Sequence, residues 1–383
     1  MLGVQCNGPI TDEGADGGAA AAICRFPADI PELTSIRALA ALAVVVFHFW
    51  AEAGATSAGG RLLAAGGLGV DLFFVLSGLV LTHVYLRDWR AGTFGHGRFL
   101  WKRFARLYPV HLVTLLGFVA LYAGARTTGL GGDFEGEDWA AFPIHLVGLQ
   151  AWGLADGAAW NHPSWSISAE AFAYLLFPLW LAAALWLGAR AFLLACVLVF
   201  LAAGMSMEAT GIELTGLTHD FGILRIAVEF GLGVGLYLVL LRVPPARWHG
   251  AAAAACLVLA AGAAVAGLPE FLAVGLLAAM LGLLASAARR PEGRGLLRAP
   301  ALVYLGHISY STYMVHIAFV IVAETLIDRL GLEGAAEVAV IAAAFAGIYT
   351  ASAILYAFVE RPAQSLLLRL AGPRHDWSLA KSA

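Results

Sequence analysis

The chain has 383 residues, of which 61% are hydrophobic and 13% are charged, with a formal net charge of −3 at pH 7. A soluble domain would carry about a quarter charged residues, so this composition excludes an ordinary soluble protein and predicts a polytopic, all-α membrane protein. The near-neutral charge gives no sign of a nucleic-acid partner. The spacing of the cysteines indicates neither a disulfide framework nor a zinc site. They are Cys6, Cys24, Cys196 and Cys256.

Residues 1–30 are interpreted as a disordered cytosolic tail, because this Gly/Ala/Asp-rich stretch lacks the basic and apolar regions of a signal peptide. Ten later segments approach the roughly 20 apolar residues that a bilayer core of about 30 Å requires. They are 34–53, 66–87, 104–125, 165–187, 190–205, 219–241, 250–267, 270–287, 302–327 and 335–359. The seventh and eighth are short, which leaves nine or eleven spans open. Segment 139–155 contains Pro143 and is expected to be interfacial or re-entrant.

The basic residues predict the orientation, because Lys and Arg concentrate on the cytosolic side. With both termini inside, every internal loop is basic, whereas the external loops hold few cations and several acids. The internal set is Arg87, Arg90, Arg98, Lys102, Arg103, Arg106, Arg190, Arg242, Arg247, Arg289, Arg290, Arg294, Arg298, Arg361, Arg369, Arg374 and Lys381. We therefore expect one membrane domain over residues 31–363 and a cytosolic C-terminal tail over 364–383.

The first span contains SIRALAALAVVVFHFW, residues 35–50, with Arg37 near its cytosolic end and His48 near its external end. Their eleven-residue separation is close to three helical turns, so both lie on one face about 16 Å apart. Ionisable groups within a membrane are costly and usually mark a function or a buried pair. The alternatives are that Arg37 extends to lipid phosphates and that His48 satisfies a core hydrogen bond.

The second and fourth spans place Asp71 and Glu170 at nearly the depth of His48. Three ionisable residues from three helices at one depth predict an active-site layer near the external face, in which a carboxylate orients the imidazole. The alternative for Asp71 is a neutralising pair that holds two helices together.

Two later spans carry weaker candidates. Arg225 and Glu229 are four residues apart and can neutralise one another along a helix, so a structural role is favoured for this pair. In the ninth span His316 lies near the bilayer middle with Tyr310 and Tyr313, and either a site or a hydrogen-bonded core fits it.

The cytosolic ends of the first and third spans carry mainly basic residues. Lys102 is expected to anchor the third span, whereas Arg103, Arg106 and Arg37 form a cluster that can receive phosphates. Glu360, within FVERP, falls at the same level and is a candidate partner for Arg37.

Together these motifs resemble the acyltransferase-3 family, integral-membrane O-acyltransferases that modify surface polysaccharides, peptidoglycan and some small molecules. The resemblance covers residues 31–363 and rests on six motifs in the family's order. These are the Arg37–His48 spacing, GVDLFFVLSG at 69–78, RFARLYP at 103–109, WSISAE at 165–170, LGHISYSTYMVH at 305–316 and FVERP at 358–362.

The resemblance implies ten spans with both ends cytosolic, an acyl-CoA donor, commonly acetyl-CoA, and a hydroxyl acceptor often presented outside the membrane. It implies no permanent cofactor or metal. His48 and Arg37 match the family's functional pair, and Arg103 with Arg106 matches its Arg-x-x-Arg motif. Asp71, Glu170 and Glu360 match its recurrent acidic positions. The family often has a second Glu where this chain has Ala171, and some members carry a fused extracytoplasmic hydrolase-like domain that is not expected here.

With this resemblance, the residues predict an enzyme of a bacterial inner membrane that transfers an acyl group, with acetyl favoured, to a hydroxyl of a cell-surface glycan, another carbohydrate-containing acceptor or a small molecule. His48 is the expected general base, Asp71 or Glu170 its orienting group, and Arg37, Arg103 and Arg106 the phosphate ligands. A covalent intermediate on His48, Ser166 or Ser168 stays open, as does the oligomeric state. The alternatives are a transporter or flippase, in which buried charges line a substrate path, and a scaffold. Tryptophans of the loop 126–164 can stack on sugars or anchor the interface; they are Trp139, Trp152 and Trp160.

Overall fold

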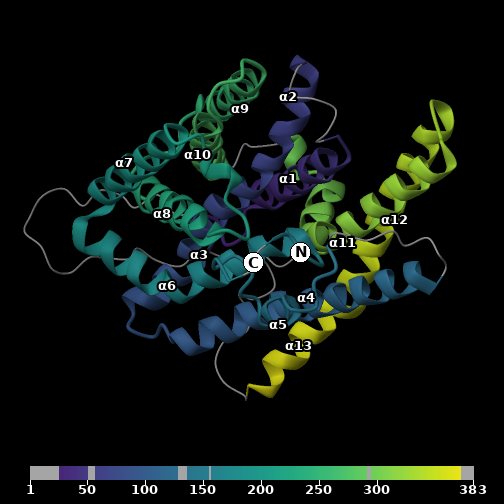
Figure 1. Cartoon of the computed structure of the whole chain (residues 1–383). Coiled ribbons are helices and arrows are strands. Elements are labelled where there is room, and N and C mark those ends of the chain that lie inside the picture. The colour runs from purple at the N-terminus through teal and green to yellow at the C-terminus, as the bar shows by residue number, and fades with distance from the viewer. Residues whose placement is uncertain (1–25, 51–56, 128–135, 155–156, 291–294, 372–383) are drawn as a thin grey trace, which may run out of the picture.

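A computed structural model describes residues 26–50, 57–127, 136–154, 157–290 and 295–371, and within these ranges the chain is helical with no strand (Figure 1). The α-helices are α1 (Pro31–Trp50), α2 (Ala58–Ala64), α3 (Gly69–Arg90), α4 (His96–Thr127), α5 (Phe142–Val147), α6 (Trp165–Leu187), α7 (Ala189–Glu208), α8 (Gly222–Leu240), α9 (His249–Val265), α10 (Glu270–Ala287), α11 (Pro300–Leu330), α12 (Ala335–Leu355) and α13 (Arg361–Leu370). The short 3₁₀ helices are η1 (Ala65–Leu68), η2 (His162–Ser164), η3 (Leu214–Gly216) and η4 (Leu296–Arg298), and η5 (Tyr356–Glu360) is a π-helix.

Each of the ten expected spans corresponds to a helix. Within the described ranges nine helical stretches are long and apolar enough to cross a membrane. The tenth, α9, is apolar but has only 17 residues, which is the shortness expected for 250–267. The segment 139–155 contains only the six-residue helix α5, so it is not a span. The side of the membrane that each terminus faces remains a prediction.

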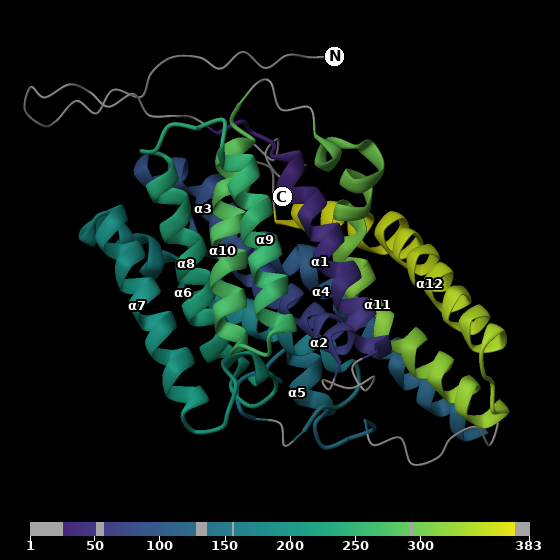
Figure 2. The same cartoon turned by 90° about the horizontal axis from the view of Figure 1, so that it is seen from above.

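The helices pack as a bundle in which neighbours in space are often distant in sequence (Figures 1 and 2). Extensive contacts join α1 to α11, α3 to α8, α9 to α10 and α11 to α12. In both views α7 and α12 lie on opposite flanks, with α1 between them. Helix α1, which carries the candidate residues Arg37 and His48, therefore lies in the middle of the bundle.

Two of these helix pairs approach closely because glycine occupies the crossing point. A Cβ on Gly78 would collide with the carbonyl of Phe230, and one on Gly233 would collide with the carbonyl of Val75. A Cβ on Gly306 of α11 would likewise collide with the carbonyl of Thr34 in α1. Small residues allow such backbone contact between membrane helices. The crossings fix α3 against α8 and α1 against α11.

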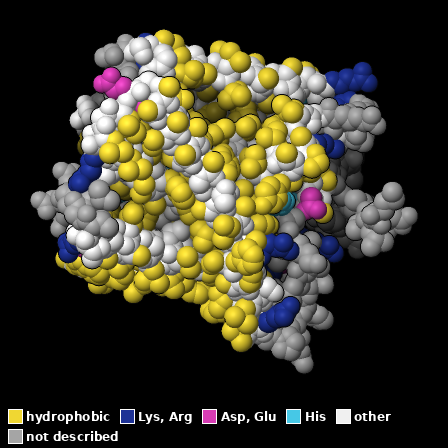
Figure 3. Space-filling model, turned by 90° about the vertical axis from the view of Figure 1, so that its right-hand side faces the viewer, with side chains coloured by type: hydrophobic (Ala, Val, Ile, Leu, Met, Phe, Trp, Pro, Cys, Tyr) yellow, Lys and Arg dark blue, Asp and Glu magenta, His cyan; other side chains and the backbone are white. Residues whose placement is uncertain are grey.

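The outer surface suits a lipid environment. Hydrophobic side chains cover a broad central area of the face in Figure 3, and most charged side chains on it lie toward its margins. Large exposed apolar side chains occur on several outer helices, among them Leu179, Trp186, Leu198 and Val258. These features, with the span count, identify an integral membrane protein.

The two expected tails lie partly outside the described residues. Residues 1–25 and 372–383 are among those that are not described, and so are Cys6 and Cys24. Residues 364–370 belong to helix α13, which packs against α4. The Trp101 indole donates a hydrogen bond to the carbonyl of Leu367 at 3.0 Å. The C-terminal segment therefore begins as a helix held to the bundle.

Candidate active site

Helix α1 carries Arg37 and His48, and each of these residues lines a different cavity in the bundle. Eleven residues of helix separate them by about 16 Å. The two cavities share two lining residues, Val70 and Tyr313. The arginine end and the histidine end of α1 therefore face adjoining spaces that meet at this pair.

The first space, the arginine cavity, has a volume of about 120 Å³ and is lined by Arg37, Arg103 and Arg106 from α1 and α4. Arg103 is buried with 8% exposure, and the other two are half-buried. The Nε donor of Arg103 is buried without a hydrogen-bond partner among the described residues. Buried donors are nearly always paired, so this cavity is suited to an anionic ligand.

Glu170 belongs to the arginine cavity, which corrects its expected position beside His48. Its Oε1 accepts a hydrogen bond from the Ser77 hydroxyl at 2.8 Å, and the Tyr174 hydroxyl also bonds to it. Equal depth along two helices does not imply contact, because the side chains face different neighbours. Glu170 balances part of the arginine charge.

Glu360 closes the same end of the bundle from the π-helix η5. It is buried with 2% exposure and accepts a hydrogen bond from the Ser311 hydroxyl at 2.8 Å. The charges of Arg106 and, to a smaller extent, Arg37 act on its carboxylate, and a direct pair of Glu360 with Arg37 stays a prediction. Tyr310 lines the cavity and donates to the carbonyl of Leu107 at 2.6 Å.

The second space, the histidine cavity, has a volume of about 340 Å³ and is lined by His48 and by polar groups from several elements. Its polar lining consists of His48, His162, Glu213, Thr215, Thr218, Arg225, Glu270 and Tyr313. The rings of Phe47 and Trp165 add apolar surface. A cavity with this mixture can hold a hydroxyl-bearing molecule next to an imidazole.

A backbone carbonyl favours one tautomer of His48. Its Nδ1 lies 2.9 Å from the carbonyl oxygen of Val44, one turn earlier in α1. Because a carbonyl oxygen only accepts, Nδ1 carries the proton and Nε2 of the neutral ring is left with a lone pair. His48 thus has the protonation state that a general base requires.

The side chain that contacts His48 is His316 of α11. Its Nε2 lies 3.2 Å from His48 Nδ1, and the ring centroids are 4.7 Å apart. His316 is buried with 0% exposure. Of the two alternatives left open for His316, this contact supports a place in the candidate site.

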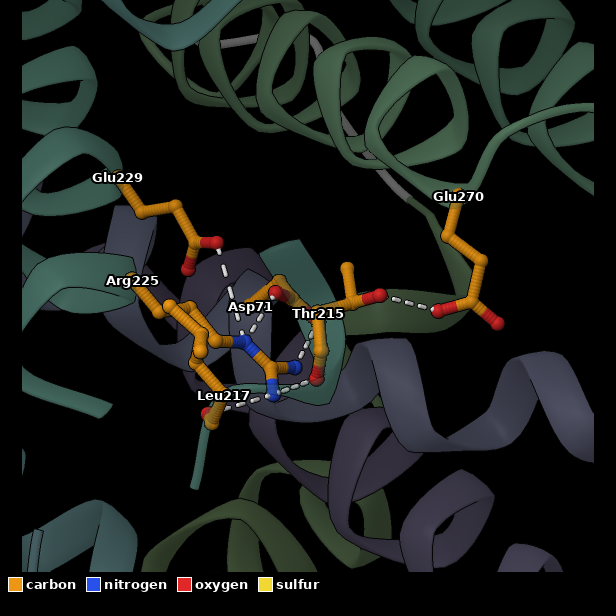
Figure 4. Close-up of polar contacts among 6 residues, drawn as sticks. All are labelled: Asp71, Thr215, Leu217, Arg225, Glu229 and Glu270. Atoms are coloured by element: carbon orange, nitrogen blue, oxygen red, sulfur yellow. Dashed lines mark hydrogen bonds and ion pairs between the residues drawn. The ribbon is translucent and has the colours of Figure 1, made fainter. Parts of the chain in front are cut away.

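Asp71 faces Arg225 rather than His48, which is a second correction (Figure 4). Arg225 Nε and Nη2 donate to the two carboxylate oxygens of Asp71 at 2.8 and 2.7 Å. The expected Arg225–Glu229 pair is present but longer, at 3.9 Å. The physical reason is helix rotation: Val70 lines the histidine cavity, and the next residue points about 100° away, toward α8.

Arg225 also holds the loop that walls the histidine cavity. It donates to the carbonyls of Thr215 and Leu217, and the Thr215 hydroxyl donates to Glu270 at 2.5 Å (Figure 4). Sequence reasoning missed Glu270, and also Glu213 and His162, which line this cavity. His162 had a usable signal, since it lies three residues before the first residue of the WSISAE motif, whereas the two glutamates had none.

The alternative nucleophiles and sugar-stacking residues are more restricted than expected. Ser166 donates to the carbonyl of Pro163 at 3.1 Å, and Ser168 accepts from the amide of Ala151 at 3.1 Å. Trp160 is buried with 2% exposure, whereas Trp139 is 55% exposed. Trp152 is half-buried, and its indole donates to the carbonyl of Ser168 at 3.4 Å, so Trp139 is the most exposed of the three tryptophans.

Within the described residues no group of three or more His, Cys, Asp or Glu side chains is arranged to hold a metal ion. No solved structure matches the chain.

Three relatives give the chain a context. Over 375 residues it is 30% identical to Acyltransferase MdmB of Streptomyces mycarofaciens, covering 89% of this chain and 93% of that protein. It is 33% identical over 148 residues to Protein 2 in picA locus of Rhizobium radiobacter, covering 39% and 72% of the two chains. Over 165 residues it is 29% identical to Peptidoglycan O-acetyltransferase OatA of Listeria monocytogenes, covering 40% and 24%.

A family profile described as an acyltransferase domain matches residues 30–357, most of the chain and both cavities. The sequence motifs, the helical bundle and this match agree. The chain belongs to the acyltransferase-3 family and is a membrane O-acyltransferase.

Proposed function

We propose that the protein transfers an acyl group, acetyl in the first instance, from acyl-CoA to a hydroxyl of a glycan or another carbohydrate-containing acceptor. The observation that carries the proposal is the pair of adjoining cavities along α1. One has three guanidinium groups against the carboxylate of Glu170, and the other contains an imidazole with an available Nε2.

The arginine cavity is proposed to bind phosphate groups of the donor. Guanidinium groups bind phosphate through charge-assisted, often bidentate hydrogen bonds. The unpartnered Nε of Arg103 supports this role, because an anion would satisfy it. The pantetheine arm then extends toward Val70 and Tyr313, where the thioester reaches the histidine cavity.

The reaction follows from the position of His48. Its Nε2 removes the proton of the acceptor hydroxyl while the oxygen attacks the thioester carbon. The C–S bond breaks, the new C–O ester bond forms, and the proton on His48 passes to the departing CoA thiolate. A direct transfer of this kind does not require Ser166 or Ser168.

The acceptor is proposed to be presented at the histidine cavity from the external side of a bacterial inner membrane. The polar lining and the rings of Phe47 and Trp165 suit a sugar, which exposes both hydroxyls and apolar faces. The partial similarity to a protein named as a peptidoglycan O-acetyltransferase supports a glycan acceptor.

Binding of CoA to the purified protein in detergent, measured by isothermal titration calorimetry, tests the donor assignment. We expect Arg103→Gln and Arg106→Gln to weaken binding at least tenfold, since each removes charge-assisted hydrogen bonds worth about 1.5–3 kcal/mol. Arg87→Gln, at the exposed end of α3, is the control and should leave binding unchanged. Absence of CoA binding to the folded wild-type protein would refute the donor.

Release of CoA thiol separates transfer from transport. With acetyl-CoA and soluble peptidoglycan fragments as the acceptor probe, an acyltransferase releases one thiol for each ester formed. A transporter would move the fragments across a vesicle membrane without releasing thiol. Ester formation on the fragments is confirmed by mass spectrometry.

A further inference from the structure

The contacts of His48 and His316 show which ring nitrogen of each carries the proton. His316 Nδ1 lies 2.6 Å from the carbonyl oxygen of Tyr313, so this nitrogen carries the proton. The Nε2 of the neutral ring is then an acceptor. His48 carries its proton on Nδ1, because that nitrogen lies against the carbonyl of Val44. The same Nδ1–H therefore makes a bifurcated hydrogen bond, with the Val44 carbonyl as its nearer acceptor at 2.9 Å and His316 Nε2 as its second acceptor at 3.2 Å.

We propose that His316 is the positioning residue of His48, and this proposal rests on the general-base role proposed above. His316 accepts the Nδ1 proton and holds the ring so that the Nε2 lone pair faces the histidine cavity. In many enzymes a carboxylate does this task. Here the carboxylate expected to do so, Asp71, is held by Arg225, and a second imidazole occupies its place.

The fold over-determines the position of His316. The ring is buried with 0% exposure, and its Nδ1 is tied to the backbone of its own helix. Helices α1 and α11 cross closely at Gly306 and Thr34, and nearer the histidine pair the buried side chains of Val45 and Val315 belong to one packed cluster. The acceptor nitrogen is thus prearranged before any substrate binds, which lowers the cost of reaching the transition state.

The bond between the rings becomes stronger as the reaction proceeds. When His48 Nε2 takes the hydroxyl proton, the ring becomes an imidazolium, and its Nδ1–H bond to His316 becomes charge-assisted. The Nδ1 proton can shift to His316 Nε2, which transfers the positive charge to the second ring. It returns to His48 as the Nε2 proton passes to the CoA thiolate, so no atom or electron is gained or lost.

The test compares two substitutions of the same residue. His316→Leu removes the acceptor, whereas the Oε1 of His316→Gln can lie near the position of Nε2 and accept the same proton. We expect His316→Leu to lower kcat by between about tenfold and a hundredfold, the range for one charge-assisted hydrogen bond, with the KM for acetyl-CoA within twofold. His316→Gln should recover most of that loss. His111→Leu removes another buried imidazole that bonds to the His145 carbonyl, and it controls for loss of packing.

A chemical readout keeps the test independent of turnover. Diethylpyrocarbonate modifies unprotonated imidazole nitrogens, and NMR or peptide mass spectrometry locates the product. In the wild type and His316→Gln the adduct on His48 should form at Nε2 alone. In His316→Leu the Val44 carbonyl is the only acceptor left for the Nδ1 proton among the described residues, so a fraction of Nδ1 adduct should appear beside the Nε2 adduct. An unchanged Nε2 adduct in a folded His316→Leu variant with wild-type kcat would overturn the proposal. Equal losses in His316→Gln and His316→Leu, matched by His111→Leu, would also overturn it.

Failure of the proposed function gives a different result. If folded His48→Ala retained wild-type transfer, the general-base role would be wrong whatever His316 does. If His316 determined the adduct position while no acyl transfer occurred, the positioning role would be supported and the proposed acyl transfer would be wrong.

Discussion

Asp71→Asn is predicted to destabilise the fold and to leave the chemistry nearly intact. Arg225 makes two hydrogen bonds to Asp71 at 2.8 and 2.7 Å, and both side chains are almost fully buried. Removing one partner of such a buried pair costs about 3–5 kcal/mol, because the remaining charge is left unpaired. Glu229 lies 3.9 Å from Arg225 and offsets part of this charge. We therefore expect a loss near the lower end, about 3 kcal/mol.

Unfolding of the purified protein by increasing mole fraction of SDS measures the loss of stability. Asp88→Asn, near the end of the same helix, is the matched control, and its free energy of unfolding should lie within about 0.5 kcal/mol of the wild-type value. The double variant Asp71→Asn/Arg225→Gln should lose less than the sum of the single losses, because it leaves no unpaired guanidinium. In folded Asp71→Asn protein kcat should fall less than about threefold. A stable Asp71→Asn protein that has lost its turnover would refute this reasoning and restore Asp71 as a partner in catalysis.

Gly233→Ala should push α3 and α8 apart and destabilise the protein by about 1–3 kcal/mol, because the new Cβ collides with the carbonyl of Val75. Gly250→Ala is the control in the same unfolding assay, because a Cβ there meets nothing within 4 Å. Burial lowers the pKa of His145 to about 4, and an unfolded histidine titrates near 6.5, so the unfolded state binds more protons between these values. Stability should fall by about 3 kcal/mol as the pH is lowered from 6.5 to 4, and His145→Gln should flatten that part of the curve. The two glutamates of the histidine cavity should favour choline over its neutral isostere 3,3-dimethylbutan-1-ol by about tenfold in kcat/KM, the equivalent of about 1.4 kcal/mol. Glu270→Gln should reduce the difference, because Glu213 remains in the lining, and equal rates for the two alcohols in the wild type would exclude the charge effect.

Much of the fold followed from hydropathy alone. Each expected span has a matching helix, and the segment around Pro143 is not a span. This success has a simple cause, because backbone groups in lipid must be satisfied within the segment and long apolar runs have few alternatives to a helix. The weakest prediction concerned α9, whose 17 residues fall short of a full span.

The candidate site was predictable in its residues but not in its contacts. Sequence gives the depth of a side chain along a helix, and depth suggested that His48, Asp71 and Glu170 form one layer. Contact also depends on rotation about the helix axis and on which helices are neighbours. Asp71 is turned toward α8, and Glu170 lies with the arginines. The pairing of α1 with α11, which brings His316 to His48, required the tertiary structure.

The arginine cluster was the exception, since both its members and their proximity were expected. Arg103 and Arg106 are one turn apart on α4, and Arg37 lies at the matching end of α1, so depth and helix order sufficed. Glu213 and Glu270 lie at the opposite extreme. They reach the histidine cavity through a loop and a helix start, for which no periodic pattern gives a position.

The most direct measurement of the central claim is transfer of a labelled acetyl group from acetyl-CoA to soluble peptidoglycan fragments by purified protein in lipid vesicles. The wild type should form a labelled ester, and His48→Ala should lower the rate at least a hundredfold while its CoA affinity stays within twofold of the wild type. Ester formation by folded His48→Ala at the wild-type rate would contradict the account.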